Sequence, residues 1–201
     1  MKAGVVDYKA GNLRSVELAL RYLSIDYMIA DTPELLEGVD RLVFPGVGEA
    51  RSAMEVLRST GFHEFITDFA NSGKPLLGIC LGCQILMSAS DERNTECLGV
   101  FPGQVRRFSQ RPGLKVPHMG WNQVHHRGRH PVFDGIPDGA SFYFVHSYFV
   151  DPEAAEIEIA STDYGEFFTS GVGRGNITAF QFHPEKSGKL GLKLLANFFK
   201  L

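Results

Sequence analysis

Cys80 stands in a sequence setting that is typical of a catalytic nucleophile. Residues 78–84 read Gly-Ile-Cys-Leu-Gly-Cys-Gln, and an apolar run over 75–79 leads directly into the cysteine. A helix-compatible segment over 81–89 follows at once, so we expect a strand, a sharp turn with Cys80 at its apex, and then a helix. Glycines allow a strained turn, and the N-terminus of a helix favours the negatively charged thiolate.

A second motif far along the chain supplies the partners that a nucleophilic cysteine needs. Residues 180–185 read Phe-Gln-Phe-His-Pro-Glu and end an apolar segment. We expect Cys80 to attack a carbonyl carbon, His183 to take the thiol proton, and Glu185 to hold the imidazole in the required tautomer. Taken singly, each residue has a plainer explanation. Cys80 could be a buried structural cysteine, His183 a histidine whose hydrogen bonds are satisfied near a strand end, and Glu185 a solvated carboxylate. Together they predict an acyl-transfer triad.

The tetrahedral intermediate of acyl transfer also needs hydrogen-bond donors for its oxyanion. The backbone N–H of Leu81, directly after the nucleophile, is the first candidate. Residues 45–48, Pro-Gly-Val-Gly, follow another predicted strand, and the N–H of Gly46, Val47 or Gly48 is the second. The two glycines around Val47 allow this peptide to rotate, so the oxyanion hole could be formed or unformed. In isolation, an ordinary turn after a strand is the simpler explanation of these residues.

Two other uses of the cysteines fit the sequence less well. A Cys-x-x-Cys pair can form a redox couple, but Cys80 lies between glycines, and a redox role leaves the distant His-Pro-Glu motif unexplained. We expect Cys83 to pack in the first helical turn. A zinc site has still less support, because Cys97 has no second potential metal ligand at close spacing in the sequence and the histidines of 125–130 lie in a basic loop. We therefore expect no metal and no cofactor.

Composition favours a single soluble domain. The chain has 201 residues, 44% hydrophobic content and a net charge of −3, which fits one domain over 1–201 with a sizeable core. The charge balance gives no electrostatic basis for binding nucleic acid or an anionic membrane. Asp7 interrupts the N-terminal apolar run, and no run approaches the ~20 residues of a membrane span. Because the three cysteines are an odd number, we expect no disulfide framework and a cytoplasmic location.

The first half of the chain alternates short apolar strands with amphipathic helices. Such alternation predicts an α/β fold with a mostly parallel central sheet and helices on both faces. The predicted strands are 2–7, 27–30, 41–44 and 75–79, and the predicted helices are 13–23, 50–57, 62–71 and 81–89.

The second half is richer in aromatic and β-branched residues, which predicts an antiparallel, β-rich addition. Residues 173–175, Gly-Arg-Gly, predict a hairpin between the last two strands, and Ser187 is expected to cap a final helix. The predicted strands of this half are 98–101, 104–108, 121–125, 141–150, 157–162, 166–172 and 176–182.

The combined motifs resemble a known family. Gly-x-Cys-x-Gly-x-Gln at 78–84 with the later His-Pro-Glu is similar to the class I (triad) glutamine amidotransferases. Three further segments, 7–13, 117–122 and 144–148, resemble the glutaminase subunits of imidazole glycerol phosphate synthases, and the similarity runs from end to end of the chain. The resemblance implies hydrolysis of glutamine to glutamate and ammonia through a γ-glutamyl thioester on Cys80.

The resemblance also implies roles for residues around the nucleophile. Gln84 resembles the residue that holds glutamine beside the cysteine, and Glu92 lies where an acidic group binds the α-amino end of the substrate. Ser147 and Tyr148 resemble contacts to the backbone groups of the amino acid. A ligand that carries both charges needs a pocket of such mixed polarity.

A partner subunit is implied as well. In the family, segment 117–122 lies near the interface of the synthase, which implies His118, Met119, Trp121 and Asn122 as interface residues. Core packing is the plain alternative for Met119 and Trp121. The implied partner is a (β/α)8-barrel cyclase subunit that forms a heterodimer with the glutaminase and uses its ammonia in histidine biosynthesis.

Other functions fit parts of the same pattern. A related amidotransferase could supply ammonia for modifying surface-polysaccharide sugars. A hydrolase could use the triad on another small amide without any partner, although Gln84 and segment 117–122 argue against it. A binding module that kept the fold is disfavoured by the intact triad.

Overall fold

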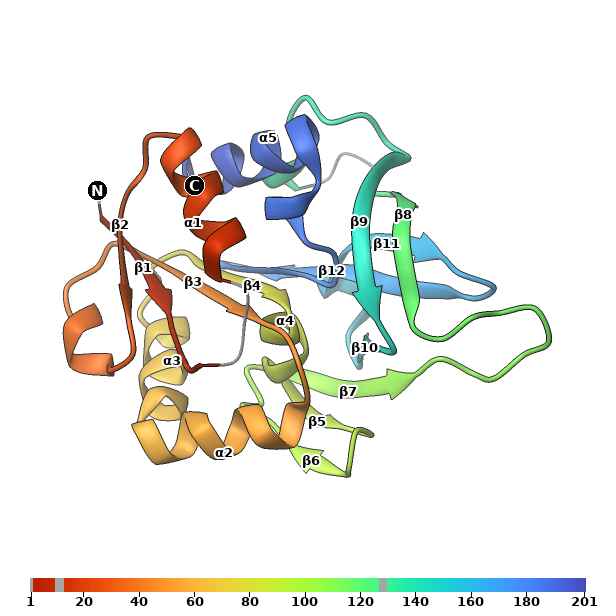
Figure 1. Ribbon diagram of the computed structural model, residues 1–201, viewed down its shortest axis with the longest axis horizontal. Helices are drawn as coiled ribbons and strands as arrows, with labels where there is room; N and C mark the ends of the chain where they lie inside the picture. Colours follow the sequence, from red (N-terminus) through yellow and green to blue (C-terminus); the bar gives the residue numbers. More distant parts are fainter. Residues whose placement is uncertain (1, 10–12, 127–129) are drawn as a thin grey trace.

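A large mixed sheet with helices on both faces forms the centre of the molecule (Figure 1). The computed structural model describes residues 2–9, 13–126 and 130–201. Its main sheet has eleven strands, in the order β2-β1-β3-β4-β13-β12-β10-β7-β5-β6, with β11 paired to β12. A separate two-stranded sheet pairs β8 with β9. The predicted α/β class with an antiparallel addition is confirmed.

One half of the main sheet is parallel. Neighbouring strands in this half pair in the same direction, and their apolar runs are buried because helices cover both faces. The strands are β1 (Lys2–Val6), β2 (Asp26–Ala30), β3 (Arg41–Gly46), β4 (Leu76–Cys80) and β13 (Ile177–Phe180).

The pairing of β4 with β13 joins the two ends of the chain. The register sets Phe180 beside Ile79 on one side of β4, and Gly46 beside Cys80 on the other. Since parallel strands end at the same edge of a sheet, the segments that follow β3, β4 and β13 emerge side by side. All the catalytic motifs predicted from the sequence lie in those segments.

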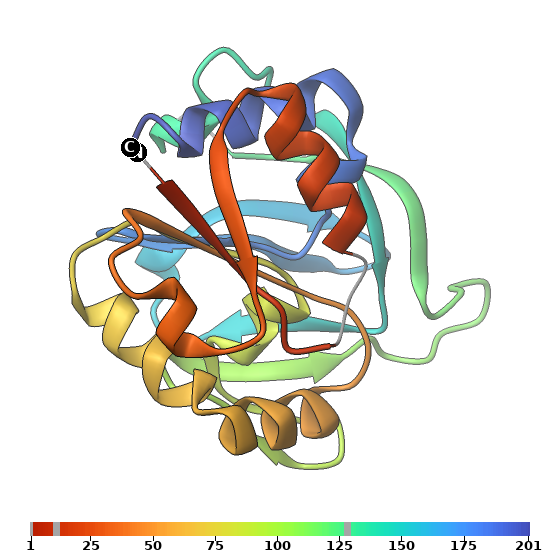
Figure 2. The same ribbon diagram turned by 60° about the vertical axis from the view of Figure 1, so that its left-hand side comes forward.

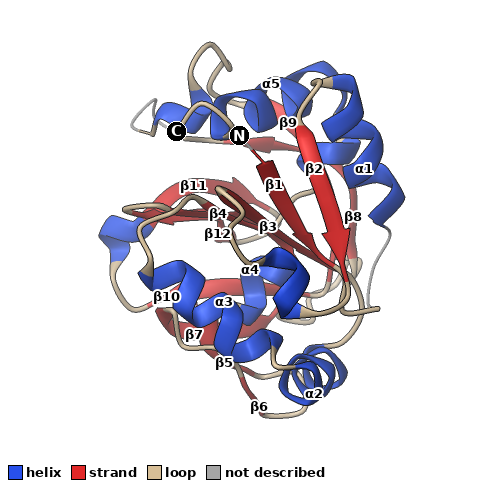
Figure 3. Cartoon of the chain, turned by 90° about the vertical axis from the view of Figure 1, so that its left-hand side faces the viewer, coloured by secondary structure: helices blue, strands red, loops and turns tan. Residues whose placement is uncertain are grey.

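Two pairs of helices cover the two faces (Figures 2 and 3). Helices α1 (Leu13–Tyr22) and α5 (Gly188–Phe198) lie on one face, and α2 (Ala50–Thr60) and α3 (Phe62–Asn71) on the other. Their apolar residues recur at helical spacing and enter two buried clusters, one on each face. The described residues also form the short helix α4 (Leu81–Ile85) and four 3-10 helices: η1 (Pro33–Leu36), η2 (Pro131–Phe133), η3 (Ala155–Ile157) and η4 (Pro184–Lys186).

The other half of the main sheet is largely antiparallel. The predicted hairpin is confirmed, because β12 and β13 pair antiparallel around residues 175 and 176. The remaining strands of both sheets are β5 (Met87–Ser90), β6 (Thr95–Glu96), β7 (Phe101–Arg107), β8 (His118–Val124), β9 (Ala140–His146), β10 (Tyr148–Pro152), β11 (Glu158–Asp163) and β12 (Phe167–Arg174).

Among the helices of the described residues, none is long and apolar enough to cross a membrane.

Several predicted boundaries are wrong. The helix predicted over 81–89 ends early, since α4 covers only Leu81–Ile85 and the chain continues as β5, which pairs in parallel with β7. Apolar residues in this stretch suit either state, and the edge of β7 decides for the strand. In place of the strands predicted at 98–101 and 104–108 there is one strand, β7, which covers Phe101–Arg107.

The strand predicted over 141–150 is broken at Ser147. Its first part, β9, pairs with β8 in the small sheet, and its second part, β10, joins the main sheet. A period-two pattern continues through this break, so the sequence could not reveal it. The change of sheet places Ser147 and Tyr148 at a corner beside the end of β4.

Helix α4 lies unusually close to β3. A Cβ added to Gly82 would stand 1.9 Å from the carbonyl oxygen of Phe44, a distance that no side chain tolerates. We expect Gly82→Ala to lower the free energy of unfolding by about 3 kcal/mol, because the helix must move away from the strand. Chemical unfolding measures the change. Ser59→Ala, at an exposed position of α2, serves as the control and should stay within about 0.5 kcal/mol of wild type. Equal stability of Gly82→Ala and wild type would contradict this packing.

Candidate active site

Cys80 occupies a strained turn between β4 and α4. Its backbone angles, φ 54° and ψ −108°, are unfavourable for a residue with a side chain. Such strain costs on the order of 1–3 kcal/mol and persists where the surrounding structure enforces it. Here the parallel pairing of β4 on both sides enforces it, and the predicted strand, turn and helix are all present.

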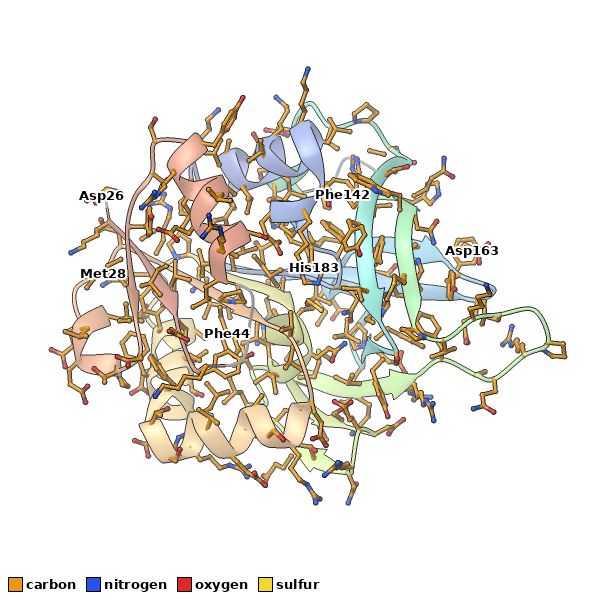
Figure 4. The ribbon with its side chains drawn as sticks, viewed as in Figure 1. Asp26, Met28, Phe44, Phe142, Asp163 and His183 are labelled. Carbon is orange, nitrogen blue, oxygen red and sulfur yellow. The ribbon has the colours of Figure 1, made fainter. Side chains whose placement is uncertain are left out.

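His183 and Glu185 form a hydrogen-bonded pair. His183 Nδ1 lies 2.8 Å from Glu185 Oε1, and their side chains are only 2% and 3% exposed. Because the carboxylate can only accept, Nδ1 carries a proton, and Nε2 is the nitrogen left for chemistry. Nε2 is buried and has no hydrogen-bond partner among the described residues. Figure 4 shows His183 in the interior of the molecule.

The turn that carries His183 is held by β9. The N–H of His183 donates to the carbonyl of Tyr143, and Ser187 Oγ accepts from the N–H of Tyr143 while donating to the carbonyl of His183. Ser187 does occupy the N-cap position of α5, but its side chain makes no capping bond. The predicted cap is therefore wrong in its detail, since the hydroxyl fixes the imidazole-bearing turn instead.

The electrostatics favour a charged imidazole. Burial opposes protonation of His183, but the negative charge of a Cys80 thiolate and the Glu185 carboxylate outweigh it and raise the pKa of His183 to about 10. An imidazolium next to a thiolate is the activated state of a cysteine nucleophile.

A cavity of about 310 Å³ opens beside Cys80. Its lining contains most of the residues predicted for the oxyanion and the substrate. Gly46 instead lines a small neighbouring void with His183 and Glu185. A larger cavity of about 640 Å³ lies elsewhere, near His125 and Phe167, and its lining contains no cysteine. The cavity beside Cys80 is lined by Val47, Gly48, Cys80, Leu81, Gln84, Glu92, Pro117, Val145, His146, Ser147 and Tyr148.

The backbone donors predicted for the oxyanion lie at the rim of this cavity. Leu81 opens α4, so its N–H has no acceptor within the helix. Gly48 has a φ of +104°, which residues with a side chain rarely adopt. A peptide next to such a residue has freedom to change orientation. The strand-end segment of Val47 and Gly48 thus lines the same cavity as Leu81.

Gln84 and Glu92 are fixed by contacts of their own. Gln84 Nε2 donates to the carbonyl of Tyr148 at 2.8 Å and to Gln181 Oε1 at 3.0 Å. Glu92 Oε2 accepts the N–H of Ala50 at 2.7 Å, at the first turn of α2. A carboxylate stabilises a helix N-terminus, so Glu92 has a structural role in addition to lining the cavity.

The predicted interface residues divide between the surface and the interior. Met119 and Trp121 are 63% and 58% exposed, so the core-packing alternative is wrong for both. Asn122 is half-buried and donates to the carbonyl of Asp163. His118 is only 2% exposed, which corrects the expectation that its side chain contacts a partner. Alternation along β8 explains the division, since successive side chains point to opposite faces.

Sequence reasoning missed three buried polar residues at the site, namely His146, Gln181 and Tyr8. His118 Nδ1 lies 2.9 Å from His146 Nε2, and His146 Nδ1 donates to the carbonyl of Tyr148 at 2.8 Å. Gln181 Nε2 donates to the sulfur of Cys80 at 3.8 Å. Tyr8 is buried near the same sulfur, and its hydroxyl has no hydrogen-bond partner within the described part of the chain. All three lie within or next to the segments that carried the family resemblance.

The cysteine and histidine side chains of the described residues form neither a disulfide nor a cluster suited to a metal ion. The three cysteines are free and buried, and burial raises the pKa of the Cys97 thiol to about 12. No group of three or more His, Cys, Asp or Glu side chains in the described ranges could hold a metal ion. Residues 10–12 of the resembling segment 7–13, and 127–129 of the basic loop, lie outside the described residues.

The histidine pair makes a prediction about acid stability. Burial lowers the pKa of His118 to about 4 and that of His146 to about 3. Unfolded histidine titrates near 6.5, so the unfolded chain binds more protons than the folded chain below that pH, and stability should fall as pH drops from 6.5 to 4. The pKa of His183 is shifted in the opposite direction, so its contribution to stability is lost as pH rises from 6.5 to about 10 and does not change below 6.5.

Unfolding measured across this range should show a smaller slope in His118→Phe, by up to about 1.4 kcal/mol per pH unit. Ile66→Val, in the buried cluster on the α2–α3 face of the sheet, is the control. It should lower stability equally at every pH. A slope in His118→Phe equal to that of wild type would contradict the neutral, buried pair.

Comparison with known proteins agrees with this geometry. The family described as glutamine amidotransferase class-I matches residues 5–201. The chain is 48% identical over 203 residues to the imidazole glycerol phosphate synthase subunit HisH of Aromatoleum aromaticum, covering 96% of this chain and 95% of the relative. It is 46% identical over 198 residues to the protein of the same name from Dehalococcoides mccartyi, with coverage of 98% and 96%.

Solved structures are similar in fold. The crystal structure of a glutamine amidotransferase from Thermotoga maritima superposes with a TM-score of 0.69 at 20% identity, covering 100% of this chain and 82% of that chain. At this identity the likeness concerns the fold alone. The match to residues 5–201 and the identities to full-length relatives show that the chain belongs to the class-I glutamine amidotransferase family.

Proposed function

We propose that this chain is the glutaminase subunit of an imidazole glycerol phosphate synthase and acts in histidine biosynthesis. The observation that carries the proposal is the position of Cys80, on a strained elbow beside a cavity that Gln84 and Glu92 line. The sequence relatives that bear the synthase subunit name support the pathway. The chain works as one cytoplasmic domain over 1–201.

The reaction starts when His183 Nε2 takes the proton of the Cys80 thiol. The sulfur attacks the amide carbon of glutamine, and the N–H groups of Leu81 and of the segment 46–48 receive the oxyanion. His183 returns its proton to the leaving nitrogen, which departs as ammonia and leaves a γ-glutamyl thioester. Water then attacks the thioester with His183 as base, and glutamate is released. Glu185 stabilises the imidazolium in both halves.

The cavity suits a small amphoteric substrate. A volume of about 310 Å³ is enough for an amino acid. Glu92 offers a carboxylate to the α-amino group, and Ser147 with Tyr148 offers polar groups to the carboxylate end. Gln84 holds the side chain of the substrate next to the sulfur.

A partner must receive the ammonia, because ammonia released into water becomes protonated and loses its nucleophilicity. Met119 and Trp121 form an exposed apolar pair on one face of β8, whereas the side chain of Asn122 points to the other face. Exposed large apolar side chains close together are typical of an interaction surface. We assign this face of β8 to a cyclase subunit that forms a heterodimer with the chain.

Control by the partner acts through the oxyanion segment. Gly48 leaves the neighbouring peptide free to turn, and a partner that binds one orientation better shifts the population toward it. Glutamine hydrolysis is then slow in the isolated chain and faster in the complex with bound acceptor.

Cys80→Ala should abolish glutamine hydrolysis, because the lining of the cavity then contains no thiol that could form the thioester. Glutamate release measured with the cyclase subunit and its nucleotide present checks this, and the loss should exceed about a thousandfold. Cys97→Ala, at another buried free cysteine, should retain wild-type hydrolysis. Hydrolysis by Cys80→Ala would contradict the assigned nucleophile. No stimulation of the wild type by the cyclase would contradict the assigned pathway.

Trp121→Ala should weaken binding of the cyclase subunit by about tenfold or more, since exposed aromatic residues dominate interface energies. Titration calorimetry measures the dissociation constant. Tyr22→Ala, at an even more exposed aromatic side chain on α1, should bind as wild type. Equal affinities for both variants would place the interface elsewhere.

A further inference from the structure

One buried carboxamide connects the nucleophile to the substrate-binding side chain. Gln181 follows β13, is fully buried, and donates its backbone N–H to the carbonyl of Ser170. Its side-chain Oε1 accepts from Gln84 Nε2 at 3.0 Å, and its Nε2 lies 3.8 Å from the sulfur of Cys80. No step of the proposed reaction uses this residue.

The orientation of both carboxamides follows from a backbone carbonyl. The oxygen of Tyr148 can only accept, so the Gln84 group that faces it at 2.8 Å must be the NH2 group. The second hydrogen of that NH2 group needs an acceptor, which Gln181 Oε1 supplies. The NH2 group of Gln181 must therefore face Cys80. His146 Nδ1–H also donates to the Tyr148 oxygen and fixes the start of this chain.

The sulfur has different partners in its two protonation states. As a thiol, Cys80 donates its S–H toward the carbonyl of Val145 at 3.9 Å. When the proton moves from Sγ to His183 Nε2, the sulfur keeps the electron pair and can no longer donate. A carbonyl oxygen cannot stabilise the resulting anion, whereas the N–H of Gln181 can, and hydrogen bonds to a charged group are stronger than neutral ones.

We propose that Gln181 is a further catalytic residue, whose side-chain N–H stabilises the Cys80 thiolate while its carbonyl fixes the carboxamide of Gln84. One amide thus sets both the charge state of the nucleophile and the orientation of the side chain that receives the substrate. The inference rests on the proposed function, because it takes Cys80 as the nucleophile.

The test measures the thiolate directly. The rate at which iodoacetamide alkylates Cys80 is followed against pH, and mass spectrometry locates the label on its peptide. Cys80→Ala gives the background from the two other thiols. The titratable groups near the sulfur are Tyr8, Cys83, His146 and His183. Glu92 and Tyr148 line the same cavity, and Glu185 is bonded to His183.

Gln181→Met keeps the volume of the side chain and removes both hydrogen bonds. We expect the midpoint of the alkylation profile to rise by about one pH unit and kcat for glutamine to fall about tenfold. KM should rise as well, because Gln84 loses one of its two acceptors. Thr178→Val, at a buried position of β13, should leave the midpoint unchanged. A wild-type midpoint in Gln181→Met overturns the inference.

A second measurement needs no substitution. The side-chain NH2 resonances of Gln181 in the wild-type protein should shift with the same midpoint as alkylation of Cys80. Resonances that do not respond to ionisation of the sulfur overturn the inference. Neither result bears on whether Cys80 is the nucleophile, which the hydrolysis assay of Cys80→Ala decides.

Discussion

The parallel pairing of β4 with β13 is the constraint on which the site depends. It joins a strand from the first half of the chain to a strand near its end, and its register sets Phe180 beside Ile79. One residue beyond this pair, Cys80 turns into α4 and Gln181 leaves the sheet. A slip of one residue would reverse the faces of all these side chains and separate Gln181 and His183 from the sulfur.

The elements around this pair hold the reacting groups from several directions. β9 fixes the turn of His183 through Tyr143 and Ser187. The corner at Ser147 brings the carbonyl of Tyr148 over α4, where it orients Gln84. Glu92 reaches the first turn of α2 and so restrains the chain that follows the oxyanion segment. Buried polar groups are stabilising only when they are paired, and these pairings account for most of the buried polar side chains at the site. The Tyr8 hydroxyl and His183 Nε2 have no hydrogen-bond partner among the described residues.

The triad could be predicted because its residues lie in short, local motifs. The strand before Cys80, the glycines around it and the His-Pro-Glu turn are each readable within a few residues. The end of α4 and the break at Ser147 could not be predicted, because the partner strand decides them in each case. The residues 85–87 are apolar in a way that suits helix or strand, and only the edge of β7 selects the strand. The burial of His118 depends in the same way on stacking between Phe144 and Tyr164.

The central claim is that this geometry forms a covalent acyl intermediate on Cys80. The most direct measurement is rapid acid quenching of the complex during turnover of glutamine, followed by peptide mass spectrometry. The account predicts a γ-glutamyl group on the peptide that contains Cys80. Steady turnover with an unmodified Cys80 peptide, or with the label on another residue, would contradict it.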